Sequence, residues 1–520
     1  MADNNKDSVM FSSQRTQRTF RVWAAAGLCA ASAEAFPAGL ELLQHGAKEL
    51  GHGFAGTATL LEDSSAIAHN PAGLLLLDGT RFSGGFSPLY IDLDYNVSVQ
   101  REKIEGIYGL EPTLVSGPGN ASSTDISVVP HFYLSHRISE DAAVGLGVYV
   151  PFASGSDFPS GWAGRYHSET TAQQAVNINP AFAFRVSDKV SVGFGGFLQF
   201  YEATLTNQID VGYLVAEGVI EQVRDQQGED AARDTARDAV NRLGSQFDVE
   251  NDVQIDSLAY GLNVGVLWDI SQRTRAGLNF RTRTEHLATG RARRPEINDA
   301  AFRERLVQTV QGFTNVTEED AREATAAAFD GRGAMGGDID ADVILPEILT
   351  LSGQHQLTEK MTLMGSVTWT NWSVFDEFRL SYTDDSLRGG SDLAGTGDDL
   401  RRRDLVQPLE FEDSYRFGLG MRYQYNDRLT WRAGASFDQS PLRNSDFRTP
   451  RGPDNDRVVA GLGASYQFSE NLGIDAGYAL IRILESDVTV FENPAGTQHR
   501  AIGTTEGTLH NLGLQANYVF

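Results

Sequence analysis

The feature that most constrains this chain is a strict alternation of apolar and polar residues, which recurs along most of its length. One example lies between positions 91 and 99, where the apolar residues are Ile91, Leu93, Tyr95, Val97 and Val99 and the residues between them are Asp92, Asp94, Asn96 and Ser98. Successive side chains of a β-strand point to opposite faces, so a period of two predicts strands. About fourteen such segments can be counted, beginning near positions 81, 126, 142, 173, 189, 257, 273, 343, 361, 411, 428, 457, 471 and 508.

Apolar runs are short everywhere in the chain. No uninterrupted stretch of about 18 apolar residues is present, which excludes a membrane protein built of helices. In hydrocarbon every backbone N–H and C=O must be paired, so strands cross a bilayer only as a closed barrel. We therefore predict an all-β fold, a transmembrane antiparallel β-barrel of about 14 strands. A large soluble β-sandwich or propeller is the alternative.

The connections between the predicted strands differ in length. Short ones, such as Ser139 to Asp141 and Asn426 to Arg428, alternate with long polar ones near 207–256, 291–341 and 384–408. Short turns at one end and long loops at the other are typical of outer-membrane barrels. Glycine and polar residues at one face, such as Gly145, Gly147 and Gln515, are expected to line the interior.

Two of the long connections carry helical patterns. Val215, Val219, Ile220 and Val223 have helical spacing between residues 213 and 243. Residues 300–329 behave likewise, and a capping-box-like Thr317 to Asp320 opens the second half of that segment. Their apolar stripes could either dock on the barrel rim or capture ligand, and the sequence leaves both open.

The first 35 residues are predicted to be an export signal. Basic residues precede the apolar run from Val22 to Ala33, and Ala33-Glu34-Ala35 is a plausible cleavage site. The only cysteine, Cys29, lies inside this segment, so the mature chain would have no disulfide and no thiol chemistry. The net charge of −26 argues against nucleic-acid binding, which needs clustered cations.

Motifs for catalysis or cofactor binding are weak. Residues Gly51 to Gly56 match G-x-G-x-x-G by letter, but no strand precedes them and no acidic residue follows at the required place. Asp338 to Asp342 resembles the start of a calcium loop without its glycine and terminal glutamate, which favours a solvated loop. The sequence therefore predicts no catalytic residue, no metal and no cofactor. An outer-membrane enzyme that modifies lipids is the alternative from another class.

Several segments, in this order along the chain, carry a resemblance to a known family. They are residues 39–95, Asn177 to Pro180, Leu345 to Glu347, Thr368 to Ser373, Phe437 to Pro441 and Pro453 to Arg457. The sequence resembles the FadL/TodX-type transporters of the outer membrane, which carry long-chain fatty acids or aromatic hydrocarbons. The two helical insertions diverge from the family pattern.

The resemblance implies a domain organisation. Residues 36–78 would form an N-terminal hatch that plugs the barrel of residues 79–520, and Asn70, Pro71 and Ala72 match the family's hatch motif. It also implies a kink in the third strand that opens the wall sideways, which this sequence places at Pro151, Phe152 and Gly155. Proline removes a donor from the strand ladder and favours a bulge.

The function implied is passive, ligand-gated uptake in the outer membrane of a Gram-negative bacterium. The expected ligand is a long-chain fatty acid, with neutral hydrocarbons as the alternative, and it would leave through the wall into the outer-membrane lipids. A carboxylate needs a cation, for which Arg165, Arg281 and Arg283 are the candidates. The chain is expected to act as a monomer and to be recognised by the barrel-assembly machinery through its C-terminal Phe520.

Overall fold

The computed structural model describes residues 41–314, 316–329, 336–383, 405–452, 454–492 and 499–520. The predicted export signal, residues 1–35, and most of the predicted loop 384–408 lie outside these ranges. Among the described residues, no helix is both long and apolar enough to cross a bilayer.

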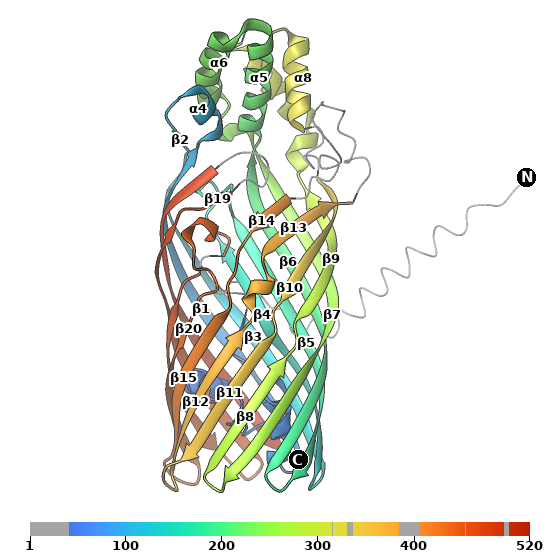
Figure 1. The fold of residues 1–520 in the computed structure, drawn as a ribbon, viewed down its shortest axis with the longest axis vertical. Helices are drawn as coiled ribbons and strands as arrows, with labels where there is room; N and C mark the ends of the chain where they lie inside the picture. The colour runs from blue at the N-terminus through green and yellow to red at the C-terminus, as the bar shows by residue number, and fades with distance from the viewer. Residues whose placement is uncertain (1–40, 315, 330–335, 384–404, 453, 493–498) are drawn as a thin grey trace, which may run out of the picture.

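The described strands form one closed antiparallel sheet (Figure 1). The first strand, β1, pairs on one side with β3 and on the other with the last strand, β20, so the sheet closes on itself. Four of the fourteen strands are interrupted near their middle and carry two labels each. The predicted barrel of about 14 strands is thus confirmed. In chain order the strands are β1 (Thr80–Arg101), β3 (Asn120–Ser139), β4 (Ala142–Asp157), β5 (Thr170–Ser187), β6 (Val190–Asp210), β7 (Asp248–Ser271), β8 with β9 (Thr274–Arg281 and Thr284–Arg293), β10 with β11 (Gly337–Leu345 and Ile348–Gln356), β12 with β13 (Met361–Thr370 and Glu377–Tyr382), β14 with β15 (Leu405–Pro408 and Ser414–Gln424), β16 (Leu429–Asp438), β17 (Arg457–Gln467), β18 (Leu472–Val488) and β20 (His499–Val519).

The two ends of the barrel differ, as the connection lengths predict. At one end the strands are joined by turns of two to four residues, and the C-terminus lies there (Figure 1). At the other end Figure 1 shows a group of helices above the barrel. These helices are α4 (Lys103–Tyr108), α5 (Val211–Gln227), α6 (Glu229–Arg242), α7 (Ala300–Gln311) and α8 (Glu318–Phe329). Two further short strands, β2 (Thr113–Leu114) and β19 (Phe491–Glu492), pair beside them with β1 and β20.

The helical insertions follow the predicted pattern. The helical stripe of α5, including Val215 and Val219, is buried, and Thr317 Oγ1 accepts the backbone N–H of Asp320, as the capping box requires. The apolar faces of α4 to α8 pack mainly against one another in a core of their own. The apolar stripes are therefore buried within this group of helices, α4 to α8, which we call the cap.

One sequence prediction about a loop is wrong. Asp338 to Asp342, which we interpreted as a solvated or calcium-type loop, lies in strand β10. Ile339 and Ala341 are buried, and the aspartates alternate with them on the outer face. The strands also extend several residues into the predicted loops, because the barrel continues beyond the band of exposed apolar side chains.

That band shows which face of each strand is inside, and β1 illustrates it. Towards the short-turn end, Phe86 and Tyr90 are exposed on the outer face while Ser83 and Ser87 are buried inside. Towards the helical end the pattern reverses: Asp92, Asp94, Asn96 and Ser98 face outward, and Ile91, Leu93, Tyr95, Val97 and Val99 face the interior. The barrel therefore has an apolar outer belt around a polar interior at one end, and a polar outer surface around an apolar interior at the other.

The hatch fills the polar interior. It contains α2 (Ala47–Gly51), α3 (Ala66–His69) and the 3₁₀ helix η1 (Pro71–Leu76), all largely buried. Its backbone lies directly on glycines of the wall: a Cβ atom on Gly434 would lie 1.8 Å from the carbonyl oxygen of His52, and one on Gly477 would lie 1.9 Å from that of Ala47. Only glycine permits this approach, so the wall is shaped to seat the hatch.

Candidate functional site

The predicted hatch motif is held tightly against the wall. Asn70 is fully buried, and its Nδ2 donates to the carbonyl oxygens of Ala58 at 2.9 Å, Val266 at 3.1 Å and Leu278 at 3.4 Å. Its Oδ1 accepts the N–H of Ala72 at 3.1 Å, the local turn bond expected of an Asn-Pro sequence. The motif therefore joins the hatch to strands β7 and β8.

Glycines of the wall make this docking possible. A Cβ atom on Gly265 of β7 would lie 1.9 Å from Asn70 Oδ1, and one on Gly193 of β6 would lie 2.2 Å from the backbone nitrogen of Ala72. The sequence alone gave Gly193 and Gly265 no role. Every polar atom of the Asn70 side chain is engaged, so this part of the hatch is its anchor.

A buried cluster of charges fixes the hatch near the short-turn end. Lys48 of the hatch lies 2.8 Å from Asp63 and 3.6 Å from Asp475 of β18, and Glu62 lies 2.5 Å from Nη2 of Arg432 on β16. Burial alone would raise the pKa of Glu62, but Arg432, Arg422 and Lys48 hold it below its ordinary value. The cluster is balanced in charge and links the hatch to strands β15, β16 and β18.

The sheet is irregular at the place in β4 where a kink is predicted. The pairing of β4 with β5 shifts register between Tyr149 and Phe152, which places one extra residue at Pro151. In the part of the chain that the structure describes, β4 pairs with β3 only from Val148 towards the short-turn end. Beyond Val148, Asp157 N–H reaches Ser123 Oγ at 2.9 Å across the same boundary. Gly155 lies in the stretch between these two points.

The ladder between β3 and β4 is thus missing over several residues of backbone, although the residues of β4 from Tyr149 to Ser156 are all buried. Phe152 is turned inward, with its ring 6.4 Å from that of Trp372. In this stretch β4 stays paired with β5, and β3 stays paired with β1, so the β3–β4 boundary is held without backbone ladder bonds. The family's lateral kink is expected at this place.

Glu41 and Leu42, which we call the tip of the hatch, contact the β4 kink directly. The backbone N–H of Leu42 donates to the carbonyl oxygen of Pro151 at 2.8 Å, and Glu41 forms an antiparallel bridge with Phe152. The side chain of Glu41 points to the opposite wall, where it lies 3.5 Å from Nη2 of Arg416 on β15. The hatch tip therefore spans the interior from β4 to β15.

The three predicted head-group cations lie in different places. Arg165 lies in the loop between β4 and β5, with Nε 2.7 Å from Asp248 and Nη1 2.6 Å from the carbonyl oxygen of Ser116. Its Nη2 donates to Tyr166 Oη at 3.0 Å. Arg165 therefore belongs to a saturated network near the helical end, which continues through Arg101, Asp210 and His499.

Arg283 and Arg281 flank the break between β8 and β9. Arg283 is half exposed and pairs with Glu347 at 2.7 Å, across to the break between β10 and β11. Arg281 is buried, and its Nη2 donates to the carbonyl oxygen of Ala68 at 3.2 Å, while its Nε has no hydrogen-bond partner among the described residues. Of the three, only Arg281 is close to the hatch and has a free donor.

A small cavity lies beside Arg281. It has a volume of about 40 Å³ and is lined by the hatch tip and the facing wall. The charged and titratable residues among its lining are Glu41, His45, His69, Arg281 and Arg416. Burial, together with His69 and Arg281, holds the pKa of His45 well below its ordinary value, so this ring is neutral. Sequence reasoning missed Glu41 and Arg416, because a single charge in a strand or at a hatch end carries no spacing signal.

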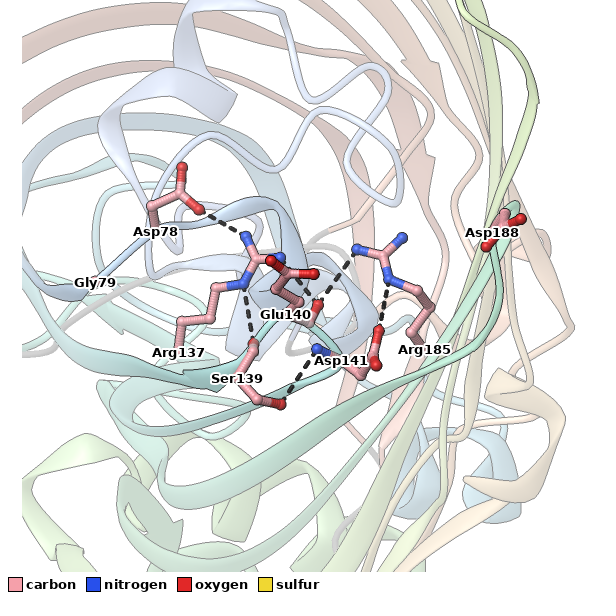
Figure 2. Close-up of a pocket in the computed structure, with 8 residues that line it drawn as sticks. All are labelled: Asp78, Gly79, Arg137, Ser139, Glu140, Asp141, Arg185 and Asp188. Atoms are coloured by element: carbon pink, nitrogen blue, oxygen red, sulfur yellow. Dashed lines mark hydrogen bonds and ion pairs between the residues drawn. The ribbon is translucent and has the colours of Figure 1, made fainter.

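Two larger hollows lie at the short-turn end. One, of about 360 Å³, lies beneath the charge cluster around Lys48 and Arg432. The other, of about 630 Å³, is drawn in Figure 2, where Arg137 reaches Asp78 at 2.6 Å and Arg185 reaches Asp141 at 3.2 Å. The first pair joins the end of the hatch to β3, and the second joins β5 to the turn between β3 and β4. Among the described residues, no group of three or more His, Cys, Asp or Glu side chains is placed to hold a metal ion.

Comparison with known proteins identifies the family. The profile described as "Outer membrane protein transport protein (OMPP1/FadL/TodX)" matches residues 28–520. The chain belongs to this family. It is therefore an outer-membrane transport protein and not an enzyme, which removes the lipid-modifying alternative. The family consists of transporters of hydrophobic compounds.

Individual relatives are distant but collinear. Outer membrane protein P1 of Haemophilus influenzae is 25% identical over 512 residues, covering 95% of this chain and 98% of that protein. The long-chain fatty acid transport protein of Escherichia coli is 24% identical over 496 residues, covering 94% and 96%.

Solved structures share the fold. The crystal structure of a Pseudomonas aeruginosa FadL homologue superposes with a TM-score of 0.74 at 22% identity, covering 93% of this chain and 100% of that one. The toluene transporter TodX of Pseudomonas putida gives a TM-score of 0.54 at 16% identity, covering 94% and 99%. The short-turn end is accordingly the periplasmic end, and the helical cap is extracellular.

Proposed function

We propose that this protein takes up long-chain fatty acids by passive, ligand-gated diffusion, and that the ligand leaves sideways through the wall between β3 and β4. The observation that carries the proposal is the contact of the hatch tip with the kink: Leu42 is hydrogen-bonded to Pro151 at the edge of the unpaired stretch. A movement of Glu41 and Leu42 would change the wall where the β3–β4 ladder is missing.

The apolar interior provides the driving force. Above the hatch the barrel is lined by two clusters, one including Ile91, Leu93 and Ile481 and the other including Phe152, Val343 and Trp372. A hydrocarbon chain that leaves water for such surfaces gains roughly 0.8 kcal/mol for each buried methylene group. Partition from water to lumen and from lumen to membrane therefore needs no energy source and no cofactor.

In this proposal the hatch motif stays in place while another part of the hatch moves. Asn70 to Ala72 are bonded to the wall on all sides, while Glu41 and Leu42 are held by few contacts. We propose that the segment around Glu41 to His45 moves and that Asn70, Pro71 and Ala72 keep the rest of the plug in place. Arg281, beside the moving segment, is the head-group cation, and Arg165 stabilises the extracellular mouth.

A neutral hydrocarbon is the second candidate ligand. The net charge of −26 repels anions at long range, although salt screens this beyond about 8 to 10 Å. TodX, whose fold this chain shares, is a toluene transporter. An apolar lumen would accept either ligand. The preference for a fatty acid or a hydrocarbon therefore depends on the polar groups at the end of the lumen next to the hatch.

Uptake measurements test the proposal. Labelled oleate, hexadecane and toluene are offered to cells that lack their own hydrophobic porters and express the intact protein, a form lacking Pro151, or the control Pro88→Ala. Removal of the extra residue at Pro151 should restore the register with β5 and straighten β4 beside the unpaired boundary, so oleate uptake should fall by about tenfold or more. Pro88 lies in β1, on the side of β3 opposite to β4, and its variant should transport normally.

Two results would contradict the proposal. If no ligand enters although folded barrel is present in the outer membrane, uptake of these compounds is excluded. If the form lacking Pro151 transports as well as the intact protein, the lateral exit is excluded and passage past the hatch takes its place.

A further inference from the structure

The small cavity at the hatch tip has an unusual balance of charge. Two guanidinium groups, Arg281 from β8 and Arg416 from β15, face a single carboxylate, Glu41. All three come from different parts of the chain and meet only in the folded barrel. The lining therefore carries an excess of one positive charge beside its two histidines.

The donors of this cavity are incompletely used. Arg281 Nε and His45 Nδ1 are buried and have no hydrogen-bond partner among the described residues. Buried donors without partners are costly, so such a site favours an acceptor, and an anionic acceptor most of all. A volume of about 40 Å³ has room for one small polar group but not for a hydrocarbon chain. The chain of a bound ligand would have to extend upward into the apolar lumen.

The polar contacts of the Glu41 side chain are long. Its carboxylate lies 3.5 Å from Arg416, and Thr370 Oγ1 donates to it at 3.4 Å. Arg416 has a second acidic neighbour, Asp438, at 3.8 Å. These distances are long for charge-assisted hydrogen bonds, which are usually 2.7 to 2.9 Å. A better-placed carboxylate could therefore replace Glu41 at Arg416.

We propose that Glu41 is a built-in competitor: in the resting protein its carboxylate occupies Arg416, and the carboxylate of a fatty acid bound at Arg281 displaces it. The inference rests on the proposed uptake function and names the ligand class, a carboxylic acid, that triggers it. The exchange replaces one carboxylate by another at Arg416, so it leaves no guanidinium unpaired. A neutral hydrocarbon cannot make this exchange.

The displacement has a direct route to the wall. Glu41 precedes Leu42, whose N–H is bonded to the Pro151 carbonyl, and Glu41 itself bridges Phe152. When the Glu41 carboxylate leaves Arg416 and Thr370, its attachment to β15 and β12 is lost and the backbone contacts of Glu41 and Leu42 with β4 remain. Glu41 and Leu42 can then move out of the lumen together with the β4 kink. This movement opens a path for the ligand from the cavity to the unpaired β3–β4 boundary.

Two variants that break the same ion pair distinguish competition from a structural role. Purified full-length protein in detergent is titrated with oleate, and binding is measured for the parent, Glu41→Gln and Arg416→Gln. Removing the competitor should tighten oleate binding by about threefold to tenfold, whereas removing the cation should weaken it by about tenfold. Arg416→Lys keeps the charge and should fall between the parent and Arg416→Gln.

Arg275→Gln is the matched control. It breaks an ion pair of the same barrel outside the cavity, that of Arg275 with Asp269 at 2.7 Å, and should leave oleate binding unchanged. Circular dichroism and the heat-modifiable mobility of the barrel confirm that each variant is folded. If Glu41→Gln and Arg416→Gln shift oleate affinity in the same direction, or if neither shifts it, the competition is excluded.

Hexadecane separates this inference from the proposed function. In the cellular assay both Glu41→Gln and Arg416→Gln should lower the ratio of oleate to hexadecane uptake, because the tip is released without a carboxylate. An unchanged ratio overturns the inference even if both ligands are transported. Failure of the parent protein to transport any ligand overturns the proposed function, whatever the order of oleate affinities.

Discussion

At the scale of single residues, the hatch and its wall depend on close backbone contacts. Asn70 uses its whole amide group to join the hatch to β7 and β8, and Gly265 makes the room for it. Removing a buried, fully bonded amide usually costs about 1 to 3 kcal/mol, because its partners lose their acceptor or donor. These contacts hold the hatch in the barrel, and they predict which substitutions would let small molecules pass it.

Gly434→Ala should unseat the hatch. The added Cβ atom would lie 1.8 Å from the carbonyl oxygen of His52, so the hatch backbone must move. We expect increased entry of small hydrophilic antibiotics in cells that express the variant. Gly353→Ala is the control, because nothing lies within 4 Å of a Cβ atom at that position of β11. Equal antibiotic sensitivity in the two variants would show that the glycine contact does not hold the hatch.

At the scale of elements, the hatch, the β4 kink and the helical cap have different kinds of stability. The hatch buries charges and histidines, the kink gives up hydrogen bonds, and the cap packs apolar helix faces together. Burial of ionisable side chains makes the hatch the element whose stability depends on pH. The cap and the kink, which rely on apolar packing and backbone geometry, should respond little.

Acidification should loosen the hatch. Burial and the nearby Arg432 lower the pKa of His52 from 6.5 to about 3, so between these values the unfolded chain binds more protons than the folded one. The stabilisation is complete above pH 6.5 and is lost as the pH falls, by ~2 kcal/mol for His52 at about pH 5. His45 adds to the same trend.

The melting temperature of the purified barrel measures this effect. The melting temperature of the parent should fall more between about pH 7.5 and about pH 5 than that of His52→Gln, because glutamine cannot take up the proton. Glu62 and Asp63, whose pKa values are held low, stay ionised over this range. A variant that loses as much as the parent would show that His52 does not set the pH response.

At the scale of the whole molecule, the reversal of polarity seen along β1 divides the barrel into two parts. The periplasmic part has an apolar outer belt and holds the hatch, while the extracellular part has a polar exterior and an interior lined by apolar clusters under the cap. The apolar interior thus lies directly above the ring that the hatch fills. The ligand would pass from one to the other at the height of the kink.

Two substitutions on the same face of β1 test this division. Phe86→Arg places a charge in the belt, where arginine near the midplane costs about 2 to 4 kcal/mol, and should reduce the amount of folded barrel in the outer membrane. Asp92→Arg lies six residues further along the same face, above the belt, and should assemble normally. Equal assembly of both variants would contradict the position of the belt.

The sequence by itself determined the strand pattern, the unequal ends and the helical insertions. Period-two segments, short turns and capping signals are local, and local geometry decides them. The hatch motif and the kink at Pro151 also came from the sequence, through resemblance and through the effect of proline on a strand.

Only the tertiary structure decided which face of each strand is inside, because alternation reads the same whether the apolar face meets lipid or lumen. It placed the apolar residues from Ile91 to Val99 on the lumen side of β1. It also separated Arg281, beside the hatch, from Arg165 and Arg283, and brought Glu41 to Arg416 across 375 positions of chain. Such pairs are set by the closure of the barrel around the plug, and no spacing in the sequence encodes them.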